Sequence, residues 1–452
     1  MWQLEDVLKA VEGTLLNREQ DQFTSISIDS RSIKKGDLFV PLIGPRFDGH
    51  VFAREAYAKS AAGCLCQKDR ESACAGSGGT IILVDDTTKA LLDLARYKRK
   101  QLGGAFVAIT GSNGKTTTKE LLAHIMAGFA SLAYNEKNYN NNIGVSQTIL
   151  SIADQPAYCI LELGTNHPGE IAALADLVEP DLSIITNVNA SHLEGLGDIA
   201  GVFREKASLF ERTKESGTIL INIDDPNLKT LAEKPVRRSY TYAIEARADF
   251  MLSTQESKGL GGFEIELSLQ GEKVKTTAHL LGMHNLYNIV AAASIAHLCG
   301  VPGETIREKV ATFEPYPGRF KAVASKKGYT IIDDAYNANP SSMEWAIETL
   351  EQLPCRGKKI AILGEMKELG EDNAEYHRKL GRFLKKSSLS NILFFGEAAR
   401  AAYDEMNNGR AKFFDDKAAL IAYAAALVRE DDLILVKGSR AMKMNEVVGE
   451  LL

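Results

Sequence analysis

Short apolar runs, separated by polar turns and by stretches with helical periodicity, recur along all 452 residues of the chain. In the first 86 residues, the alanine-rich stretch 52–62 has the spacing of a helix. Three apolar runs in the same region predict strands: 25–28, 38–42 and 80–84. This combination predicts a mixed α/β N-terminal domain at residues 1–86.

From residue 87 to residue 316, short apolar strands alternate with helical patterns, which is typical of a mostly parallel sheet. The stretch 263–269 differs, because apolar and polar residues alternate there at period two and so predict a small antiparallel β insert within 240–281. We therefore predict a central domain at residues 87–316. Its parallel strands are expected at 106–109, 159–163, 182–186 and 218–222.

The last part of the chain, residues 317–452, repeats the alternation of strands and helices and predicts a Rossmann-like C-terminal domain. A run rich in proline and glycine at 314–318 predicts the linker that leads into it. Its strands are expected at 330–333, 359–363, 392–395 and 433–436. The expected fold class is therefore α/β with three domains.

Composition and charge exclude several classes of protein. Hydrophobic residues make up 45% and charged residues 25%, as in globular chains, and acidic residues outnumber basic ones by 59 to 53, which argues against nucleic-acid partners. The most apolar stretch, 289–301, is shorter than the ~20 residues of a membrane span, so we expect no membrane insertion. Six cysteines without metal-type spacing indicate reduced thiols and a cytoplasmic location. We expect a monomer, because no spare amphipathic seam is visible.

The strongest chemical signal is the segment 106–117, in which an apolar strand, a glycine-rich turn and the start of a helix follow one another. Such an arrangement cradles phosphate groups with backbone N–H groups, while Lys115 reaches the terminal phosphates and Thr116 can hold Mg²⁺. The common pattern has glycine where this chain has Ile109, so the loop is a variant; the alternative is a glycine-rich turn with a chance match. The residues expected to bind the nucleotide are Gly111, Ser112, Asn113, Gly114, Lys115, Thr116 and Thr117.

Two further polar residues lie at or near the carboxyl ends of predicted parallel strands, the edge at which open α/β sheets bind ligands. Glu162 lies within an apolar strand, where a carboxylate is costly unless it is paired, and His192 follows the strand that ends at Thr186. Together with the phosphate loop they predict a Mg²⁺–nucleotide site with oxygen ligands from Thr116 and Glu162. The residues alone leave His192 open between a metal ligand and an ordinary loop residue, because magnesium prefers oxygen.

Three polar loops follow strands of the third region, at 333–340, 364–370 and 437–440. Each loop by itself is unremarkable in composition. Three of them at one sheet edge predict a second ligand-binding rim that closes over the phosphate loop and keeps water from a reactive intermediate.

These segments, taken in order along the chain, resemble the Mur ligase family over essentially its whole length. The resemblance implies an ATP-dependent ligase that joins D-alanyl-D-alanine to UDP-N-acetylmuramoyl-tripeptide through an acyl phosphate, giving the pentapeptide precursor of peptidoglycan, ADP and phosphate. The segments that carry it are 29–31 with 35–40, then 110–120, 138–145, 162–170, 191–195, 282–288, 317–319, 333–340 and 364–370.

The resemblance also implies roles for single residues. The uridine diphosphate end of the substrate would contact the first domain at Ser30 and Arg31, and the third-domain loops would receive the dipeptide. The muramoyl and peptide part would contact Asn138, Asn141, Thr165 and Ser191. ATP would contact Asn285 and Asn288 at the adenine, Asp334, Tyr336 and Asn337 near the ribose or phosphates, and Arg319, which with Mg²⁺ and Lys115 would neutralise charge.

Lys206 lies in the stretch 199–210, which has the periodicity of a helix. Lys206 is near the centre of its apolar face, whereas Glu205 is expected on the opposite, solvated face. From periodicity alone, a lysine that extends its ammonium out of an apolar stripe is an alternative. The resemblance instead implies that Lys206 carries a carbamate formed with carbon dioxide and binds the metal alongside His192. Catalytic roles are then implied for Lys115, His192 and Lys206.

Three alternative functions have to be weighed. A sister Mur ligase that adds the third amino acid has an Asp-Asn-Pro-type motif in its third domain, whereas the similar string here, 224–227, lies in the central domain. Folylpolyglutamate synthase has no counterpart for the segments 29–31 and 35–40. A regulatory P-loop ATPase without a ligase product would explain the phosphate loop but not Asn285, Arg319 and the three polar loops.

Overall fold

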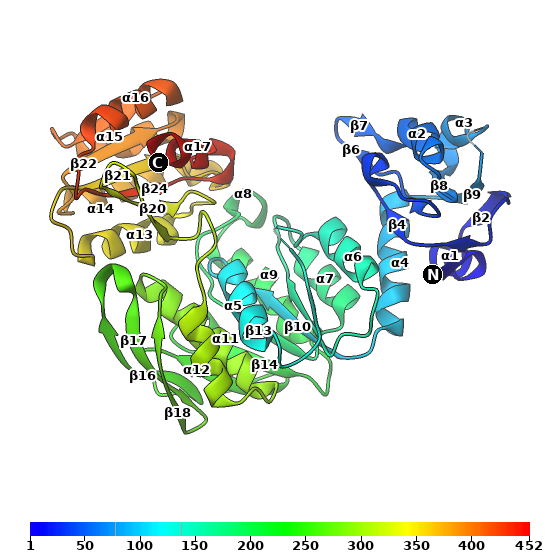
Figure 1. The fold of residues 1–452 in the computed structure, drawn as a ribbon, viewed down its shortest axis with the longest axis horizontal. Helices are drawn as coiled ribbons and strands as arrows, with labels where there is room; N and C mark the ends of the chain where they lie inside the picture. The colour runs from blue at the N-terminus through cyan, green and yellow to red at the C-terminus, as the bar shows by residue number, and fades with distance from the viewer. Residues whose placement is uncertain (77, 137) are drawn as a thin grey trace. The chain divides into compact units, whose positions relative to one another are not determined.

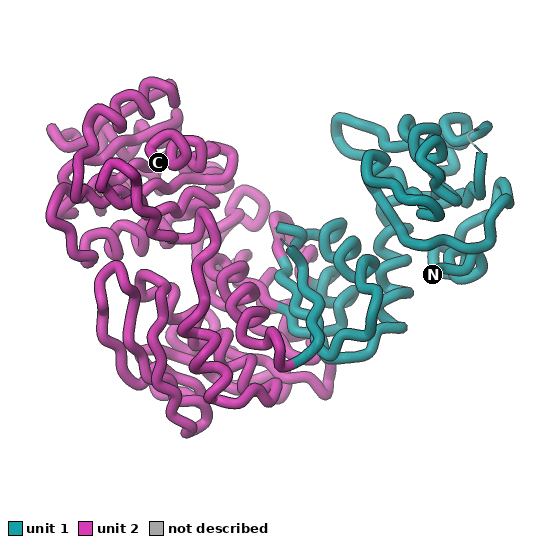
Figure 2. The backbone as a smooth tube through the Cα atoms, viewed as in Figure 1, with its two compact units in different colours: residues 1–108, 130–163, 172–180 teal, residues 109–129, 164–171, 181–452 magenta. Residues whose placement is uncertain are grey.

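The structure is a computed structural model of the chain, and it describes residues 1–76, 78–136 and 138–452. Strands and helices alternate through most of its length (Figure 1). The chain divides into two compact units (Figure 2). Unit 1 comprises residues 1–108, 130–163 and 172–180, and unit 2 comprises residues 109–129, 164–171 and 181–452.

Unit 1 begins with a five-stranded sheet in the order β2-β9-β8-β5-β4, in which only the pairing of β2 with β9 is antiparallel. Its strands are β2 (Thr14–Asn17), β4 (Ile26–Ser27), β5 (Leu38–Phe39), β8 (Gly63–Gln67) and β9 (Thr80–Val84). The helices around it are α1 (Leu4–Val11), α2 (Ala53–Ala58), α3 (Glu71–Cys74) and α4 (Thr87–Gln101). Two short antiparallel pairs join β1 (Trp2–Gln3) to β3 (Gln22–Phe23) and β6 (Ile43–Gly44) to β7 (Phe47–Asp48). The predicted mixed α/β character of this region is confirmed.

The rest of unit 1 is a short parallel array followed by helices. Its strands lie in the order β11-β12-β10, and β10 continues into unit 2 with its last two residues. The bounds are β10 (Ala105–Thr110), β11 (Leu132–Tyr134), β12 (Tyr158–Glu162), α6 (Asn142–Ser151) and α7 (Glu170–Val178).

In unit 2, the sheet runs in the order β10-β13-β14-β15-β16-β17-β18. The pairs from β13 to β16 are parallel, and β16, β17 and β18 form an antiparallel meander, which confirms the predicted insert. The strands are β13 (Leu182–Ile185), β14 (Thr218–Asn222), β15 (Arg238–Ala243), β16 (Phe250–Ser257), β17 (Phe263–Leu269) and β18 (Glu272–Ala278). The helices are α5 (Lys115–Met126), α8 (Leu193–Leu196), α9 (Ile199–Arg212), α10 (Pro226–Glu233), α11 (Met283–Leu298) and α12 (Gly303–Thr312).

Unit 2 ends in a six-stranded sheet with the order β19-β20-β24-β21-β22-β23, parallel except for the edge strand β19. Side chains from its strands and from α16 and α17 form one apolar core. The strands are β19 (Lys321–Ala324), β20 (Thr330–Asp334), β21 (Lys359–Gly364), β22 (Asn391–Phe395), β23 (Ala411–Phe414) and β24 (Leu433–Lys437). The helices are α13 (Pro340–Gln352), α14 (Asn373–Lys385), α15 (Arg400–Met406), α16 (Lys417–Leu427) and α17 (Asn445–Leu451).

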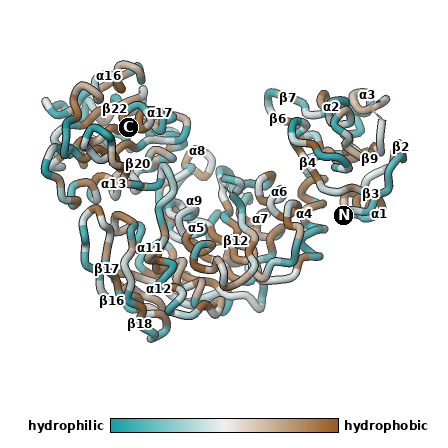
Figure 3. The backbone as a smooth tube through the Cα atoms, viewed as in Figure 1, coloured by the Kyte–Doolittle hydropathy of each residue, from teal (hydrophilic) through white to brown (hydrophobic). Residues whose placement is uncertain are grey.

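Short 3₁₀ turns connect several of these elements: η1 (Ser30–Ser32), η2 (Gly49–Phe52), η3 (Lys68–Arg70), η4 (Gly259–Gly261), η5 (Gly370–Asp372), η6 (Glu397–Ala399) and η7 (Arg440–Met442). Hydrophobic and hydrophilic segments alternate along the chain (Figure 3), and the fully buried side chains come from inner strands and from the helices packed on them. Within the described part of the chain, no helix combines the length and the apolar character that crossing a membrane requires. The three large sheets and their helices form the three-domain α/β fold that the sequence predicts.

Candidate functional site

The loop between β10 and α5 depends on two glycines. Gly111 has φ +150° and Gly114 has φ +81°, values that side chains with a Cβ rarely adopt. A Cβ added to Gly111 would lie 1.9 Å from Thr186 Oγ1, and one added to Gly114 would lie 2.2 Å from Asn288 Oδ1. Gly114 is the N-cap of α5, and no described side chain caps that helix. The first-turn N–H groups of α5 are therefore left to an anion.

Ile109 explains why this phosphate loop departs from the common pattern. The residue is fully buried and still belongs to β10, so the strand continues past the position at which other loops turn. The turn begins at Gly111 instead. A shorter loop with two glycines therefore delivers Lys115 and Thr116 to the first turn of α5.

The loop satisfies its own polar groups through contacts with the segment after β13. Lys115 Nζ donates to the carbonyl oxygen of Gly111 at 2.7 Å. The Asn113 N–H donates to Asn187 Oδ1 at 3.0 Å, and Ser191 Oγ donates to Ser112 Oγ at 2.9 Å. The structure thus brings Ser191 and the phosphate loop together at one edge of the sheet.

His192 lies in the same place, with a left-handed backbone at φ +52°. Its Nδ1 atom is 2.7 Å from Glu368 Oε2, an ion-pair distance that lacks the alignment of a hydrogen bond. Burial lowers the pKa of His192, the Glu368 carboxylate opposes this, and the charges of Lys115 and Lys206 add to the lowering. Glu368 comes from the third-domain loop 364–370, so that loop reaches the site, although the sequence did not single out this residue.

Lys206 is almost completely buried, with 1% of its surface exposed. Burial, followed by the charge of Lys115, holds the pKa of its ammonium well below the ordinary value, and Glu205 opposes both. Its ammonium forms no hydrogen bond or ion pair with any residue that the structure describes. The helix expected at 199–210 is observed as α9. Its periodicity puts Ile199 on the same apolar face as Lys206, but Ile199 is 42% exposed.

Glu205 contradicts the expectation that it faces solvent. It is only 6% exposed, because its carboxylate accepts hydrogen bonds from the Gly169 N–H at 2.6 Å and the Ile171 N–H at 2.7 Å. Thr165 Oγ1 donates to the same carboxylate at 3.1 Å. Helical periodicity misplaced this residue, because its carboxylate satisfies N–H groups that are otherwise free at the start of α7. The carboxylate fixes the loop that carries Thr165.

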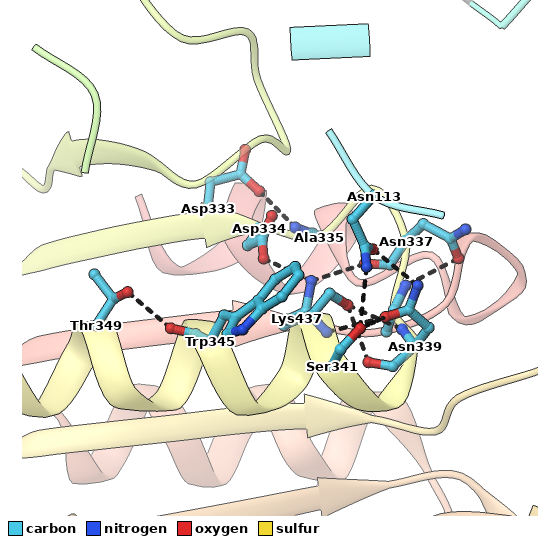
Figure 4. Close-up of polar contacts among 12 residues, drawn as sticks. Asn113, Asp333, Asp334, Ala335, Asn337, Asn339, Ser341, Trp345, Thr349 and Lys437 are labelled. Atoms are coloured by element: carbon cyan, nitrogen blue, oxygen red, sulfur yellow. Dashed lines mark hydrogen bonds and ion pairs between the residues drawn. The ribbon is translucent and has the colours of Figure 1, made fainter. Parts of the chain in front are cut away.

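Two groups of the third domain contact or flank the phosphate loop. Arg319 Nη2 donates to Thr116 Oγ1 at 3.0 Å, and its guanidinium lies 3.8 Å from the centre of the Tyr336 ring. Beside them, Lys437 Nζ donates to Asp334 Oδ2 at 2.6 Å and to the carbonyl oxygen of Asn337 at 3.0 Å (Figure 4). Burial raises the pKa of Asp334, and the Lys437 ammonium opposes that rise.

Asn113 provides a third contact, through its side chain (Figure 4). Its Nδ2 atom donates to Ser341 Oγ at 3.0 Å, and its Oδ1 atom accepts from Asn339 Nδ2 at 2.8 Å. Sequence reasoning missed both partners. The Asn339-Pro340 pair is nevertheless a recognisable helix-start signal, because asparagine favours the N-cap and proline the first helical position.

Asn285 and Asn288 support the loop from behind. Both are at least 95% buried in α11. Asn288 Nδ2 donates to Asn285 Oδ1 at 2.9 Å, and Asn285 Nδ2 donates to the carbonyl oxygen of Leu281 at 2.9 Å. Thr118 Oγ1 donates to Asn288 Oδ1 at 3.3 Å, so the pair is tied to α5.

A hollow of about 210 Å³, counted with its opening to solvent, lies beside the first turn of α5. Its walls combine hydroxyl groups, a carboxylate, aromatic rings and a guanidinium. The lining residues are Thr116, Thr117, Glu120, Phe313, Pro315, Tyr316 and Arg319.

Unit 1 holds the remaining candidate residues of the sheet edge. Glu162, at the end of β12, is 3% exposed, and its Oε1 atom accepts from Asn140 Nδ2 at 2.8 Å. Asn141 Oδ1 accepts from the Gly144 N–H at 2.9 Å and so caps α6. The carbonyl oxygen of Asn138 accepts from the Asn140 N–H at 2.8 Å. Asn138 and Asn141 thus hold the segment that presents an amide to Glu162.

Elsewhere in unit 1, Ser30 and Arg31 form the turn η1. The guanidinium of Arg31 meets the Asp29 carboxylate at 2.8 Å and, by this hydrogen bond, lowers the pKa of Asp29 to about 2. Arg31 is largely exposed, while Ser30 is buried and its carbonyl oxygen accepts from Lys59 Nζ at 3.1 Å.

The described residues contain no group of three or more His, Cys, Asp or Glu side chains arranged to hold a metal ion. Mg²⁺ sites that work on phosphates commonly use one or two carboxylates together with substrate oxygens and water. Among the residues expected at the metal, Thr116 offers a hydroxyl in the open first turn of α5, and Glu162 a buried carboxylate. Both are oxygen ligands of the kind that Mg²⁺ prefers.

Comparison with known proteins matches all three regions of the chain to models of one family. Residues 22–99 match the Mur ligase family, catalytic domain; residues 109–296 match the Mur ligase middle domain; and residues 318–440 match the Mur ligase, glutamate ligase domain.

Individual relatives are similar over nearly the whole chain. UDP-N-acetylmuramoyl-tripeptide--D-alanyl-D-alanine ligase of Bacillus subtilis (strain 168) is 30% identical, with 99% of this chain and 98% of the relative aligned. Crystal structure I of MurF from Acinetobacter baumannii has a TM-score of 0.92 and 27% identity, covering 100% of this chain and 98% of that one. MurF ligase from Thermotoga maritima in complex with ADP has a TM-score of 0.82 and 29% identity, covering 94% and 96%. This chain belongs to the Mur ligase family.

Proposed function

We propose that this chain is an ATP-dependent ligase that joins D-alanyl-D-alanine to UDP-N-acetylmuramoyl-tripeptide and yields the pentapeptide precursor of peptidoglycan. The observation that carries the proposal is end-to-end similarity: 99% of the chain aligns with a relative of that name at 30% identity. The fold agrees with MurF structures, one of them in complex with ADP. The phosphate loop at the start of α5 supplies the matching chemistry.

The reaction needs two steps because a carboxylate is a poor electrophile. ATP transfers its terminal phosphoryl group to the tripeptide carboxylate, giving an acyl phosphate and ADP. The amine of the dipeptide then attacks the acyl carbon, an amide bond forms, and phosphate and a proton are released. Two anions have to meet in the first step, so Lys115, beside the open end of α5, and Arg319, bonded to Thr116, would offset their charge.

A Mg²⁺ ion held here would supply positive charge that offsets the phosphates of ATP. Its ligands would be Thr116, Glu162, His192 and modified Lys206. Oxygen from a hydroxyl and a buried carboxylate fits the ion. The Glu368 carboxylate, 2.7 Å from His192 Nδ1, would hold the imidazole in place.

Lys206 would carry a carbamate. A buried ammonium without a partner among the described residues is unfavourable, and its lowered pKa favours the neutral amine. The neutral amine attacks carbon dioxide, a C–N bond forms and a proton leaves. The product replaces a cation near Lys115 with an anion that can bind a metal ion. Catalytic roles then fall to Lys115, His192 and Lys206.

Further contacts follow from the family. Asn285 and Asn288 would lie at the adenine, and Asp334, Tyr336 and Asn337 near the ribose or phosphates. Ser30 and Arg31 would hold the uridine diphosphate end, and the muramoyl-peptide part would contact Asn138, Asn141, Thr165 and Ser191. These assignments draw support from position: Asn288 backs Gly114, Tyr336 stacks on Arg319, and Ser191 bonds to Ser112.

The three domains would divide these tasks. Residues 1–86 would bind the nucleotide sugar, residues 87–316 would bind ATP, and residues 317–452 would receive the dipeptide. We further propose that the enzyme acts in the cytoplasm as a monomer, where its nucleotide-linked substrate and ATP are available.

The decisive experiment measures phosphate release from ATP with each substrate omitted in turn. Release that requires both the nucleotide-sugar tripeptide and D-alanyl-D-alanine, with pentapeptide formed alongside, is the expected result. Release with a free diamino acid and the dipeptide precursor would instead identify the sister ligase. Release from ATP alone would identify a regulatory ATPase.

A further inference from the structure

Three side chains close a ring of hydrogen bonds between the phosphate loop and the third domain (Figure 4). Asn113 Nδ2 donates to Ser341 Oγ at 3.0 Å, Ser341 Oγ donates to Asn339 Oδ1 at 3.2 Å, and Asn339 Nδ2 donates to Asn113 Oδ1 at 2.8 Å. Each bond in such a ring orients and strengthens the next. The ring therefore fixes one residue of the phosphate loop against the third domain.

Each end of the ring is anchored to an ordered element. The Asn113 carbonyl oxygen accepts from Thr186 Oγ1 at 2.6 Å, and its N–H donates to Asn187 Oδ1, so this residue is held against the end of β13. Asn339 Oδ1 also accepts from the Ser342 N–H at 2.9 Å and completes the capping box of α13. The ring thus joins two rigid elements and sets the distance between them.

That distance also sets the position of the loops at the third-domain sheet edge. Helix α13 follows β20, and β20 pairs with β24, which in turn pairs with β21. The polar loops 364–370 and 437–440 follow β21 and β24 directly. A shift of α13 relative to the phosphate loop therefore moves the residues proposed to receive the dipeptide.

We infer that Asn339 and Ser341, through their ring with Asn113, are positioning residues for amide formation. They hold the third domain in a fixed position against the phosphate loop, so that the incoming amine reaches the acyl phosphate before water does. The inference rests on the proposed function. Attack by the amine forms a C–N bond, breaks the C–O bond to phosphate and releases phosphate and a proton. Attack by water gives back the carboxylate and releases the same phosphate. A loosened ring therefore releases phosphate without amide.

The test separates the ring from the helix cap. Asn339→Ser keeps an N-cap of comparable strength but is too short to reach Asn113. Ser341→Ala removes the hydroxyl that links the two amides, and the double variant abolishes the ring. The matched control is Asp416→Ser, because Asp416 caps α16 of the same domain by accepting from the Ala419 N–H at 2.7 Å.

Amide and phosphate are measured in parallel with the full-length enzyme, together with KM for ATP and the thermal midpoint. For the double variant we expect amide turnover to fall by about 10- to 100-fold and phosphate released per amide to rise above one. KM for ATP and the thermal midpoint should stay close to the wild-type values. A merely structural role would move the midpoint without changing the ratio of phosphate to amide.

Three results would overturn the inference: turnover within twofold of wild type, a ratio that stays at one, or the same loss in Asp416→Ser. If the double variant does not fold, Ser341→Ala alone decides by the same ratio. If the wild-type enzyme forms no amide at all, the proposed function is refuted. That result differs from the three above, which concern the variants, so the two failures can be distinguished.

Discussion

Helices α5 and α13 are hydrogen-bonded to each other near their N-termini, but they treat the N–H groups of their first turns in opposite ways. Helix α5 begins at Gly114 without a side-chain cap from any described residue, and so keeps its first N–H groups available. Helix α13 begins with Asn339, Pro340 and a complete capping box, so those groups are already bonded within the chain. The open end suits the binding of an anion, whereas the closed end suits a fixed contact between two parts of the protein.

The comparison shows that proximity to a ligand site does not make a helix end a ligand site. Glycine at the N-cap of α5 has no side chain to bond the first-turn N–H groups. Asparagine at the N-cap of α13 accepts from such an N–H group with Oδ1 and still has Nδ2 to donate to Asn113. Four variants change the open or the closed end separately.

Lys115→Ala should have the largest effect, because it removes the cation from the open end of α5. We expect turnover to fall about 10²- to 10³-fold, as when one charge-stabilising group is lost from a transition state. The fold should survive, which circular dichroism and thermal melting will check. Lys417→Ala, which removes a partly buried lysine paired with Glu446, should stay within twofold of wild type. Near-normal turnover by a folded Lys115→Ala enzyme would contradict the proposed role of Lys115 at the open end of α5.

Lys206→Ala probes the second cation beside the open end. We expect a loss of about 10- to 100-fold in turnover, typical for a group that tunes a metal site. High bicarbonate or a short carboxylate should restore part of it, because either supplies the missing anion. Rates are measured in carbonate-depleted and carbonate-rich buffer. Full turnover of the variant in depleted buffer would show that no carbamate is needed.

Gly114→Ala should damage the open end through the backbone. Its φ of +81° and the 2.2 Å approach of the new Cβ to Asn288 Oδ1 would force the loop to shift. Strain of about 1–3 kcal/mol is expected, and ATP affinity should fall about tenfold. The matched control is Gly128→Ala at the other end of α5, where φ is +86° but no described atom lies within 4 Å of the added Cβ. Equal ATP affinity of the two variants, by calorimetry, would speak against a special role for the Gly114 approach.

Asn339→Ala should have a modest effect on stability, because it opens the closed end. Loss of the cap should lower the free energy of unfolding by about 1 kcal/mol, measured by urea denaturation. Asn339→Ser should restore most of that stability, since serine caps nearly as well. If both variants are equally destabilised, the capping box contributes little and the contrast between the two helix ends fails.

Much of the fold was predictable because burial leaves a direct trace in sequence. The apolar runs that predict strands at 218–222 and 80–84 coincide with β14 and β9. Strands β8 and β23 were missed. The first is built around Cys64 and Cys66, and the second is four residues long, so neither forms a distinct apolar run.

The site divides in the same way. The phosphate loop is local in sequence, and spacing alone predicts its strand–turn–helix form, whose glycines the structure requires. Glu205 and Asn339 are different, because their meaning comes from partners 36 and 226 residues away. A buried carboxylate that closes a distant helix looks like a solvated charge until the fold brings the two together. Sequence reasoning therefore finds the phosphate loop and misses Glu205 and Asn339, which hold the surrounding segments in place.

Lys115 is hydrogen-bonded within its own loop, and this contact bears on how the enzyme completes a catalytic cycle. Its ammonium already has a resting partner in the Gly111 carbonyl oxygen, at 2.7 Å. On the proposed function, the lysine would exchange one acceptor for another when a nucleotide product departs, and would not be left as an unpaired charge in a confined space. Departure is therefore a swap of hydrogen bonds with little net penalty, and the same swap weakens the hold on ADP. On the proposed function, a loop that is hydrogen-bonded within itself would therefore favour release of the product over tight retention.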